Sequence, residues 1–149
     1  MTFNSHNQEG IERFIDAHER NYQLALDEVR AGEKQSHWIW YIFPQLRGIG
    51  RSYFANLYGI RDREEAEEYL KHEVLGKRLR EIISALLKHE HCSAERIFGS
   101  LDAMKVMSCM TLFDAICPDD IFAEVLNKFY NGQRCAITTR ILKQQACRI

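Results

Sequence analysis

Apolar side chains repeat at helical spacing along most of this sequence, which restricts the chain to a helical fold. In the first segment the repeat is formed by Ile11, Phe14, Ile15, His18, Tyr22, Leu26 and Val29. This spacing places the seven side chains on one face of an amphipathic helix. Gly32 follows as a typical C-terminal cap.

Three further helices are expected in the middle of the chain. Asp62 and Glu65 have the spacing of a capping box, which opens a helix that runs through Leu70. Ser93 is expected to cap a short helix that stops near Gly99. Between them, the buried face of another helix is made of Leu75, Leu79, Ile82, Ile83, Leu86 and Leu87.

The last third of the sequence predicts three more helices. Segment 101–117 is apolar on nearly all sides, which is typical of a central helix covered by its neighbours. Segment 118–120 opens the next helix, Asn131-Gly132 ends it, and Ile137 and Ile141 mark the last. We therefore predict an all-α fold with five longer and several short helices. Residues 1–149 are expected to form a single compact domain, with 1–9 as a polar N-terminal tail.

Six consecutive large apolar residues, 38–43, are harder to interpret. Their side chains favour a buried β-strand. However, the neighbouring segments are all helical and offer no partner strand, and a single strand cannot satisfy its own backbone hydrogen bonds. We predict a short helix here, with Ser36 as its N-cap and Pro44 at its end.

Charge and thiol content exclude several classes of function. The formal net charge is -1, so no overall positive field attracts nucleic acid or an anionic membrane, and nucleic-acid binding is not expected. Residues 1–10 lack the basic-then-apolar order of a secretory signal, and no apolar run reaches the length of a membrane span, so neither feature is expected. Five cysteines without a C-x-x-C pair indicate reduced thiols, with Cys109 and Cys117 packed as small apolar groups. We expect a cytoplasmic protein, either a monomer or a weak homodimer, without a cofactor.

The aromatic segment 37–45 is the first candidate binding site. In a helix, His37, Trp40 and Tyr41 share one side, while Trp38, Ile42 and Gln45 share the other. One interpretation is that the tryptophans anchor the core. The alternative is that one face lines a pocket in which a flat ring stacks on a ligand and His37 supplies a proton or hydrogen bond.

The turn that follows is a candidate anion site. Arg47, Gly48, Gly50, Arg51 and Ser52 combine fixed positive charge with backbone N–H groups near a helix start. The pattern lacks the lysine of a P-loop and the preceding strand of a dinucleotide site. A plain capped turn with solvated arginines is the competing interpretation.

Asp102 and Lys105 form the third candidate, with Ser108 one turn further along. Two charges on a largely apolar face are either an ion pair near a helix start or a pair held in a cleft for acid–base work. The sequence His89-Glu90-His91-Cys92 resembles a ligand set. However, it lacks the i, i+4 geometry of zinc-binding helices, so no metal site is predicted.

Several stretches also carry a family resemblance. They are 36–45, Gly48-Ile49-Gly50 with Ser52, 66–70 with His72, Leu75-Gly76, Arg78-Leu79, Phe98-Gly99, Asp102, Lys105 and 108–113. In these residues the chain resembles Domain of Unknown Function 1810, a family of small bacterial proteins, over nearly its whole length. The resemblance implies an all-α, superhelical arrangement and brings no established catalytic residue. Glu73, where the family tends to have proline, and Cys109, where a serine is common, depart from its pattern.

We combine these candidates in one hypothesis. The chain is expected to bind a phosphorylated or nucleotide-like small molecule, with or without catalysis, for which His37, Asp102 and Lys105 are candidate catalytic residues. The expected ligand-binding residues are His37, Trp40, Gln45, Arg47, Gly48, Gly50, Arg51, Ser52, Asp102, Lys105 and Ser108. The alternative is a protein-interaction domain that uses the aromatic segment 37–45 as an exposed patch.

Overall fold

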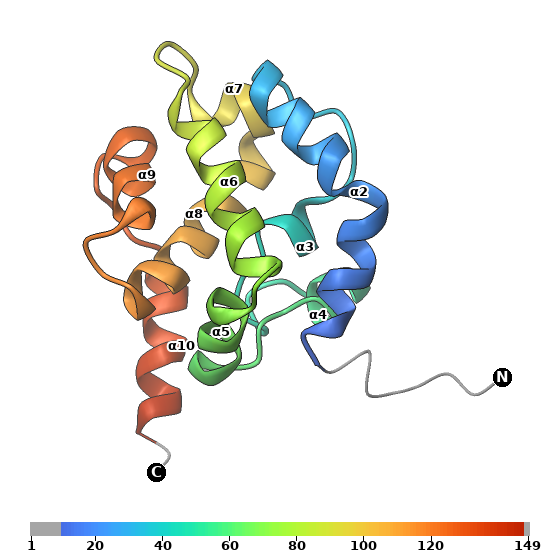
Figure 1. Cartoon of the computed structure of the whole chain (residues 1–149). Helices are drawn as coiled ribbons and strands as arrows, with labels where there is room; N and C mark the ends of the chain where they lie inside the picture. Colours follow the sequence, from blue (N-terminus) through green and yellow to red (C-terminus); the bar gives the residue numbers. More distant parts are fainter. Residues whose placement is uncertain (1–9, 148–149) are drawn as a thin grey trace, which may run out of the picture.

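The computed structural model describes residues 10–147 and contains, within that range, nine α-helices and no β-strand (Figure 1). The helices are α2 (Glu12–Ala31), α3 (Ile39–Ile42), α4 (Tyr53–Leu57), α5 (Arg63–Lys71), α6 (Leu75–Leu87), α7 (Ala94–Phe98), α8 (Ser100–Ile116), α9 (Ile121–Tyr130) and α10 (Ala136–Ala146). The all-α prediction is confirmed, with α2, α6, α8, α9 and α10 as the five longer helices. The expected tail, residues 1–9, lies outside the described residues.

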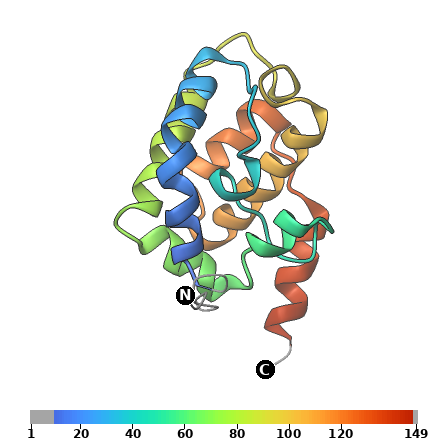
Figure 2. The same cartoon turned by 90° about the vertical axis from the view of Figure 1, so that its right-hand side faces the viewer.

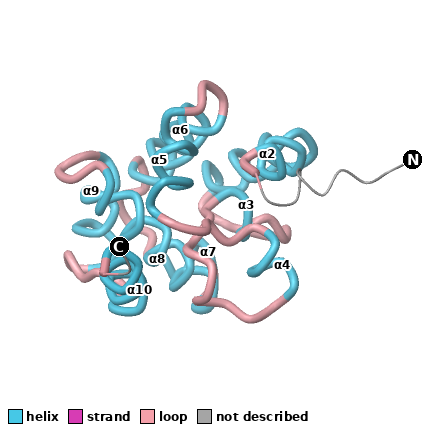
Figure 3. The backbone as a smooth tube through the Cα atoms, turned by 90° about the horizontal axis from the view of Figure 1, so that it is seen from below, coloured by secondary structure: helices cyan, strands magenta, loops and turns pink. Residues whose placement is uncertain are grey.

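Helix α8 lies at the centre of the fold. It packs against α3, α5, α7, α9 and α10, while α2 and α6 pack together beside it (Figures 2 and 3). The second half of α8 is buried, as the prediction of a central helix requires. The first half is buried on one side only, at Ala103 and Val106, while Leu101 is 75% exposed and Met104 is 64% exposed. The cover on most sides that the sequence predicts is therefore missing at this end.

Side-chain caps begin several helices. Asp62 accepts from the backbone N–H of Glu65 at 2.9 Å, and Ser93 accepts from that of Arg96 at 3.1 Å. The capping box itself is only half formed. The Glu65 carboxylate does not return to Asp62 but accepts from the backbone N–H of Arg61 and from the Arg13 guanidinium.

The Arg13–Glu65 ion pair is buried and joins the start of α2 to α5. Two nitrogen–oxygen contacts of 3.0 and 2.9 Å link the two side chains, which are 3% and 1% exposed. Arg13 also donates to the backbone oxygens of Leu57 and Gly59, at 2.7 and 2.8 Å. A buried charge needs such complete pairing. The pair therefore fixes the segment that follows α4 against α2.

Helix α3 begins two residues later than its expected cap would place it. Trp38 is the N-cap residue and contributes no side-chain bond, so the prediction that Ser36 caps the helix is wrong. The Ser36 hydroxyl instead donates to Glu28 of α2 at 2.6 Å, and the Trp38 indole N–H donates to the same carboxylate at 2.9 Å. The entry to α3 is thus organised by a carboxylate from another helix.

Two loop segments pair beside α4 and hold it in place. Leu46 and Ile60 form an isolated parallel bridge, in which the Arg47 N–H donates to Ile60 O at 2.8 Å and the Ile60 N–H donates to Gln45 O at 2.9 Å. Helix α4 lies in the part of the chain that connects the two paired segments. Its position opposite α2 and α3 therefore depends on this bridge.

Two cysteines were expected to pack as small apolar groups, and one of them does. Cys109 is fully buried. Cys117 is only partly buried, and its thiol donates to the Asp120 carboxylate at 3.1 Å, so the expectation is wrong for this residue. No helix within residues 10–147 has the length and apolar character that crossing a membrane requires.

Candidate functional site

A groove of about 630 Å³ opens between α2, α3 and α4. Figure 2 shows the three helices that border it, with α3 between α2 and α4. We call it the aromatic groove and define it by the residues that line it: Asp16, Ala17, Arg20, Asn21, His37, Trp40, Tyr41, Phe54 and Tyr58. Its volume lies within the range of about 300 to 1,000 Å³ that is usual for small-molecule sites.

Four aromatic rings form the apolar wall of the groove. The centroids of Trp40 and Phe54 are 5.2 Å apart, and those of Tyr41 and Tyr58 are 5.1 Å apart. Phe54 and Tyr58 stack at 6.2 Å with an angle of 21° between their planes. Phe54 is nevertheless 45% exposed, so part of its ring faces solvent. An exposed ring in a continuous aromatic wall offers a stacking surface for a flat ligand.

Hydrogen bonds hold Tyr41 in this wall. Its hydroxyl accepts from the Asn21 side-chain amide at 2.7 Å and donates to the His37 backbone oxygen at 3.3 Å. Burial, with a further contribution from Tyr58, raises the pKa of the Tyr41 phenol. Burial also raises the pKa of Tyr58, with Tyr53 as the next cause. Both phenols therefore remain protonated at neutral pH and present uncharged hydroxyl groups.

Charged groups stand at the edge of the groove. Asp16 and Arg20 are exposed and lie one turn apart on α2, and the exposed His37 lies at the start of α3. The charges of Asp16 and Arg20 reach the wall, since Asp16 raises and Arg20 lowers the pKa of Tyr58 as smaller contributions. The groove thus combines an aromatic wall with one cationic and one anionic group.

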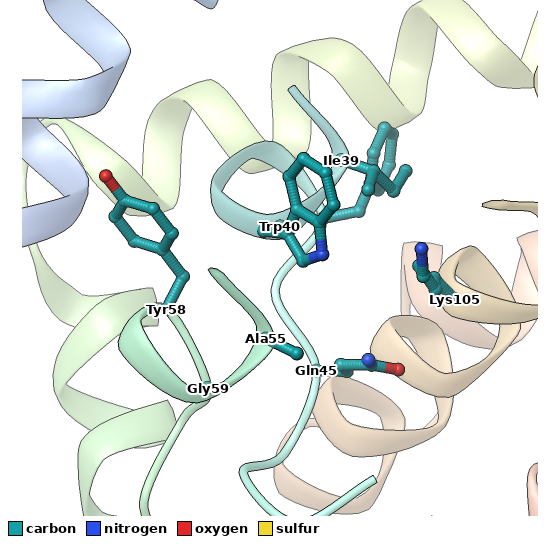
Figure 4. A pocket seen from close by; sticks show the side chains of 8 residues that line it. Ile39, Trp40, Gln45, Ala55, Tyr58, Gly59 and Lys105 are labelled. Carbon is teal, nitrogen blue, oxygen red and sulfur yellow. The ribbon is translucent and has the colours of Figure 1, made fainter. Parts of the chain in front are cut away.

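A second, much smaller cavity of about 10 Å³ lies behind Trp40. Figure 4 shows Trp40 between Tyr58 on one side and Lys105 of α8 on the other, with Gln45 and Ala55 nearby. The space is about that of one water molecule. Trp40 therefore separates the aromatic groove from the Gln45 and Lys105 side chains.

The Asp102–Lys105 ion pair is present and extends to a third charge. Asp102 contacts Lys105 at 3.1 Å and Lys34 at 2.8 Å. Burial raises the pKa of the Asp102 carboxyl, but hydrogen bonds from Lys34 and Lys105 outweigh it and hold the pKa below the ordinary value. The Lys105 ammonium lies 5.3 Å from the centre of the Trp40 ring. This cluster supports the indole from behind through a cation–π contact.

The turn at residues 47–52, the candidate anion site, does not line the aromatic groove. Ser52 caps α4 by accepting from the Ala55 N–H at 3.1 Å, and Arg47 donates to the Asn56 backbone oxygen at 3.1 Å. A Cβ added to Gly50 would lie 2.6 Å from the Ala55 Cβ, so glycine is required there for close approach. The turn acts locally as a capped connection to α4.

Ser108 lies apart from the other candidates. Its hydroxyl is buried and forms a 2.8 Å hydrogen bond with the Thr138 hydroxyl of α10. Of the eleven candidate residues, the structure places His37 and Trp40 on the aromatic groove, with Gln45 and Lys105 behind Trp40. The turn residues, Asp102 and Ser108 line neither cavity. The eleven residues do not share one hollow.

The sequence analysis missed six residues of the groove: Asp16, Ala17, Arg20, Asn21, Phe54 and Tyr58. Asp16 and Arg20 lie on the polar side of an amphipathic helix, where charged residues are usual and do not indicate a binding site. Phe54 carried a signal that could have been used. With Tyr53, it puts two large aromatic rings directly after the Ser52 cap of a very short helix.

The expected interaction patch at 37–45 is not exposed. Trp38 is 0% exposed, Ile39 and Phe43 are buried as well, and Trp40 is half-buried. Only His37 in this segment is exposed. A docking surface made of this segment is therefore excluded by its burial in the core.

Within residues 10–147, no three His, Cys, Asp or Glu side chains come together in a way that could hold a metal ion. His89, part of the sequence that resembles a ligand set, bonds through Nε2 to the Val29 backbone oxygen at 2.6 Å. This contact ties the end of α6 to the end of α2.

Comparison with known proteins gives one family and one solved structure. Residues 8–142 match the family model described as "Protein of unknown function (DUF1810)". The fold is similar to the crystal structure of the conserved hypothetical protein Rv1873 from Mycobacterium tuberculosis, with 40% sequence identity and a TM-score of 0.87. That similarity covers 89% of this chain and 96% of the other. No curated protein matches the sequence.

Proposed function

The chain belongs to the DUF1810 family of proteins of unknown function, and we propose that its aromatic groove binds a phosphorylated or nucleotide-like small molecule. The observation that carries the proposal is the groove itself, which joins a four-ring wall to a cationic group in a volume of about 630 Å³. Aromatic surfaces bind flat rings by stacking, at about 1 to 3 kcal/mol for each nucleobase. A ligand with a flat ring and an anionic group uses both features.

Phe54 and Trp40 are the proposed stacking surfaces. Their rings are in contact at 5.2 Å, and Phe54 retains 45% exposure that a ligand would cover. Lys105 and the cluster behind it hold Trp40 from the opposite side. A stacking residue that is fixed before the ligand arrives loses little conformational freedom on binding.

Arg20 is the proposed partner of the anionic group. A guanidinium binds phosphate through two parallel N–H donors, and Arg20 is exposed at the groove edge. Asp16, one turn earlier on α2, is proposed to accept hydrogen bonds from ligand hydroxyl groups such as those of a ribose. His37 is the groove's candidate proton carrier. Asp102 and Lys105 are less suited to acid–base work because they are committed to an ion pair.

The two tryptophans make binding measurable. Trp38 is fully buried, whereas Trp40 lines the groove, so a stacking ligand is expected to quench only Trp40 fluorescence. We would titrate the protein with nucleoside phosphates and with sugar phosphates that lack an aromatic base, and measure tryptophan fluorescence and thermal unfolding. At a ligand concentration 100 times its dissociation constant, the free energy of unfolding should rise by about 2.7 kcal/mol.

Matched variants identify the site. Phe54→Ala and Arg20→Gln are each expected to weaken binding about tenfold or more, as a loss of about 1.4 kcal/mol requires. Tyr53→Ala removes the neighbouring exposed ring, and Arg30→Gln removes another exposed arginine of α2, and neither residue lines the groove. The proposal fails if no compound shifts the unfolding temperature, or if the control variants weaken binding as much as the groove variants.

We also propose that this site operates in the cytoplasm, in a monomer or weak homodimer. Free thiols support the location, since the five cysteines form no disulfide in the described part of the chain. Sedimentation velocity of the purified protein tests the oligomeric state.

A further inference from the structure

Three helices bring buried polar atoms together without giving them partners. Within residues 10–147, four buried side-chain atoms lack a hydrogen-bond partner: His18 Nδ1, Tyr69 Oη, Arg78 Nη1 and Gln145 Oε1. The last belongs to α10. The other three belong to α2, α5 and α6, and α6 packs against both α2 and α5. Buried polar groups in proteins almost always have a partner, so three orphans in one region need an explanation.

Packing along α2 brings the residues that carry these three atoms into one region of the molecule. Phe14, His18 and Tyr22 follow each other at intervals of one turn on the buried face of α2. The Tyr69 ring packs edge-on against Phe14, with centroids 5.1 Å apart, and the Arg78 guanidinium lies 5.0 Å from the centre of the Tyr22 ring. His18 lies between these two contacts. The charge of Arg78 acts to lower the pKa of both His18 and Tyr69.

The hydrogen-bonding character of each group is determined by its surroundings. His18 Nε2 lies 2.7 Å from the Tyr41 backbone oxygen, which only accepts, so Nε2 carries the proton. Burial, followed by the charge of Arg78, lowers the pKa of His18 to about 4, although the bond to Tyr41 opposes this. At neutral pH the ring is therefore uncharged, and Nδ1 is an acceptor. Tyr69 and Arg78 are donors, since burial raises the pKa of the Tyr69 phenol well above its usual value.

We propose that His18 Nδ1, Tyr69 Oη and Arg78 Nη1 bind one internal water molecule, which bridges α2, α5 and α6. Water fits this set because it accepts from Tyr69 and Arg78 with its two lone pairs and donates to His18. A halide ion cannot donate to Nδ1, and a metal cation cannot accept from a guanidinium. Three hydrogen bonds are also the usual number for a buried water. The bridge holds His18, and through it the Tyr41 carbonyl at the groove wall.

A crystal structure of the protein tests this site directly. The expected result is one ordered water about 3 Å from each of the three atoms. In Tyr69→Phe, which keeps the ring and removes one donor, the water should be lost or its occupancy should fall. Tyr130→Phe is the matched control, because Tyr130 is also largely buried but its hydroxyl already donates to the Ala103 backbone oxygen at 2.6 Å.

Four results would overturn the proposal. Anomalous scattering at this position after a bromide soak would show an anion instead of water. An unchanged water in Tyr69→Phe, or no density between the three atoms, would show that they have no common partner. Nitrogen chemical shifts of the His18 ring give an independent test that needs no crystal of a variant. A proton on Nδ1 at neutral pH would contradict its role as an acceptor.

Discussion

At the scale of single residues, His18 shows how a core imidazole becomes fixed in one state. It is 2% exposed, stacks on Tyr22 at 5.8 Å, and bonds to the Tyr41 backbone oxygen. The charge of Arg78, which also lowers the pKa of His18, has the same sign as a protonated imidazole. Burial and repulsion therefore act together against protonation in the folded state.

We expect His18 to make the protein less stable in mild acid. Its pKa is about 4 when folded and 6.5 when unfolded, so the unfolded chain binds the proton more readily. The free energy of unfolding should therefore fall as the pH drops below about 6.5, and the total loss should reach about 3 kcal/mol below pH 4. Urea unfolding at several pH values, compared between the parent and His18→Gln, isolates this contribution.

The control for this prediction is His91→Gln, which removes an exposed imidazole. It should keep the full pH dependence of the parent protein, whereas His18→Gln should lose most of the part between about pH 6.5 and pH 4. Identical pH profiles for the parent and His18→Gln would contradict the prediction.

At the scale of helices, the contact between α5 and α6 depends on one glycine. Gly76 lies in the first turn of α6, and a Cβ at this position would lie 2.1 Å from the Leu70 backbone oxygen of α5. Backbone atoms cannot move aside as a flexible side chain can. The crossing of the two helices is therefore possible only without a side chain at this residue.

Gly76→Ala should destabilise the protein, although alanine is the better helix former. In an exposed helix the exchange would stabilise by up to about 1 kcal/mol. Here we expect a loss of at least about 2 kcal/mol, because the added carbon overlaps the backbone of α5. Denaturant unfolding measures the difference. Ser84→Ala, at an exposed position of the same helix, should change stability by no more than about 0.5 kcal/mol.

At the scale of the whole molecule, one hydrophobic core extends through the described residues. It contains the buried faces of α2, α6, α8 and α9 together with Trp38 and the loop residues Leu46 and Ile60. The core combines side chains from Ile11 to Leu126, so no single segment of the chain can form it alone. The buried Arg13–Glu65 pair adds a link between α2 and α5.

We therefore expect the chain to unfold in one cooperative transition. Helix content, followed by far-ultraviolet circular dichroism, and the fluorescence of the buried Trp38 should have the same denaturation midpoint. The calorimetric and van't Hoff enthalpies should also agree. Two separate midpoints would show that the chain contains two folding units and would contradict the expectation of a single domain.

Much of the fold could be predicted from local signals. Gly32 ends α2 in a left-handed conformation, Asn131 ends α9 in the same way, and Ser93 caps α7. Each signal acts over a few residues, so it is readable without knowledge of the fold. The segment 38–43 was also correctly assigned to a helix, because no partner strand was available.

The candidate site was predictable only in part, because a groove is formed by residues distant in sequence. Trp40 and His37 could be selected for their chemistry, but Asp16, Arg20 and Phe54 join them only when α2 and α4 pack on either side of α3. Glu28 and Glu65 show the same limit. The sequence predicts only a capping box for Glu65 and no role for Glu28, yet Glu28 organises the entry to α3 and Glu65 neutralises a buried arginine.

Local sequence patterns are enough to indicate which segments are helical, where most helices end and which helix faces are apolar, because these properties depend on contacts within one or two turns. Tertiary structure decided which polar groups are buried, which become partners, and which aromatic side chains stay exposed. Those outcomes depend on distances between helices, which hydrophobic spacing does not encode. For this reason Trp38 became core, while Phe54, of similar chemistry, became the wall of a groove.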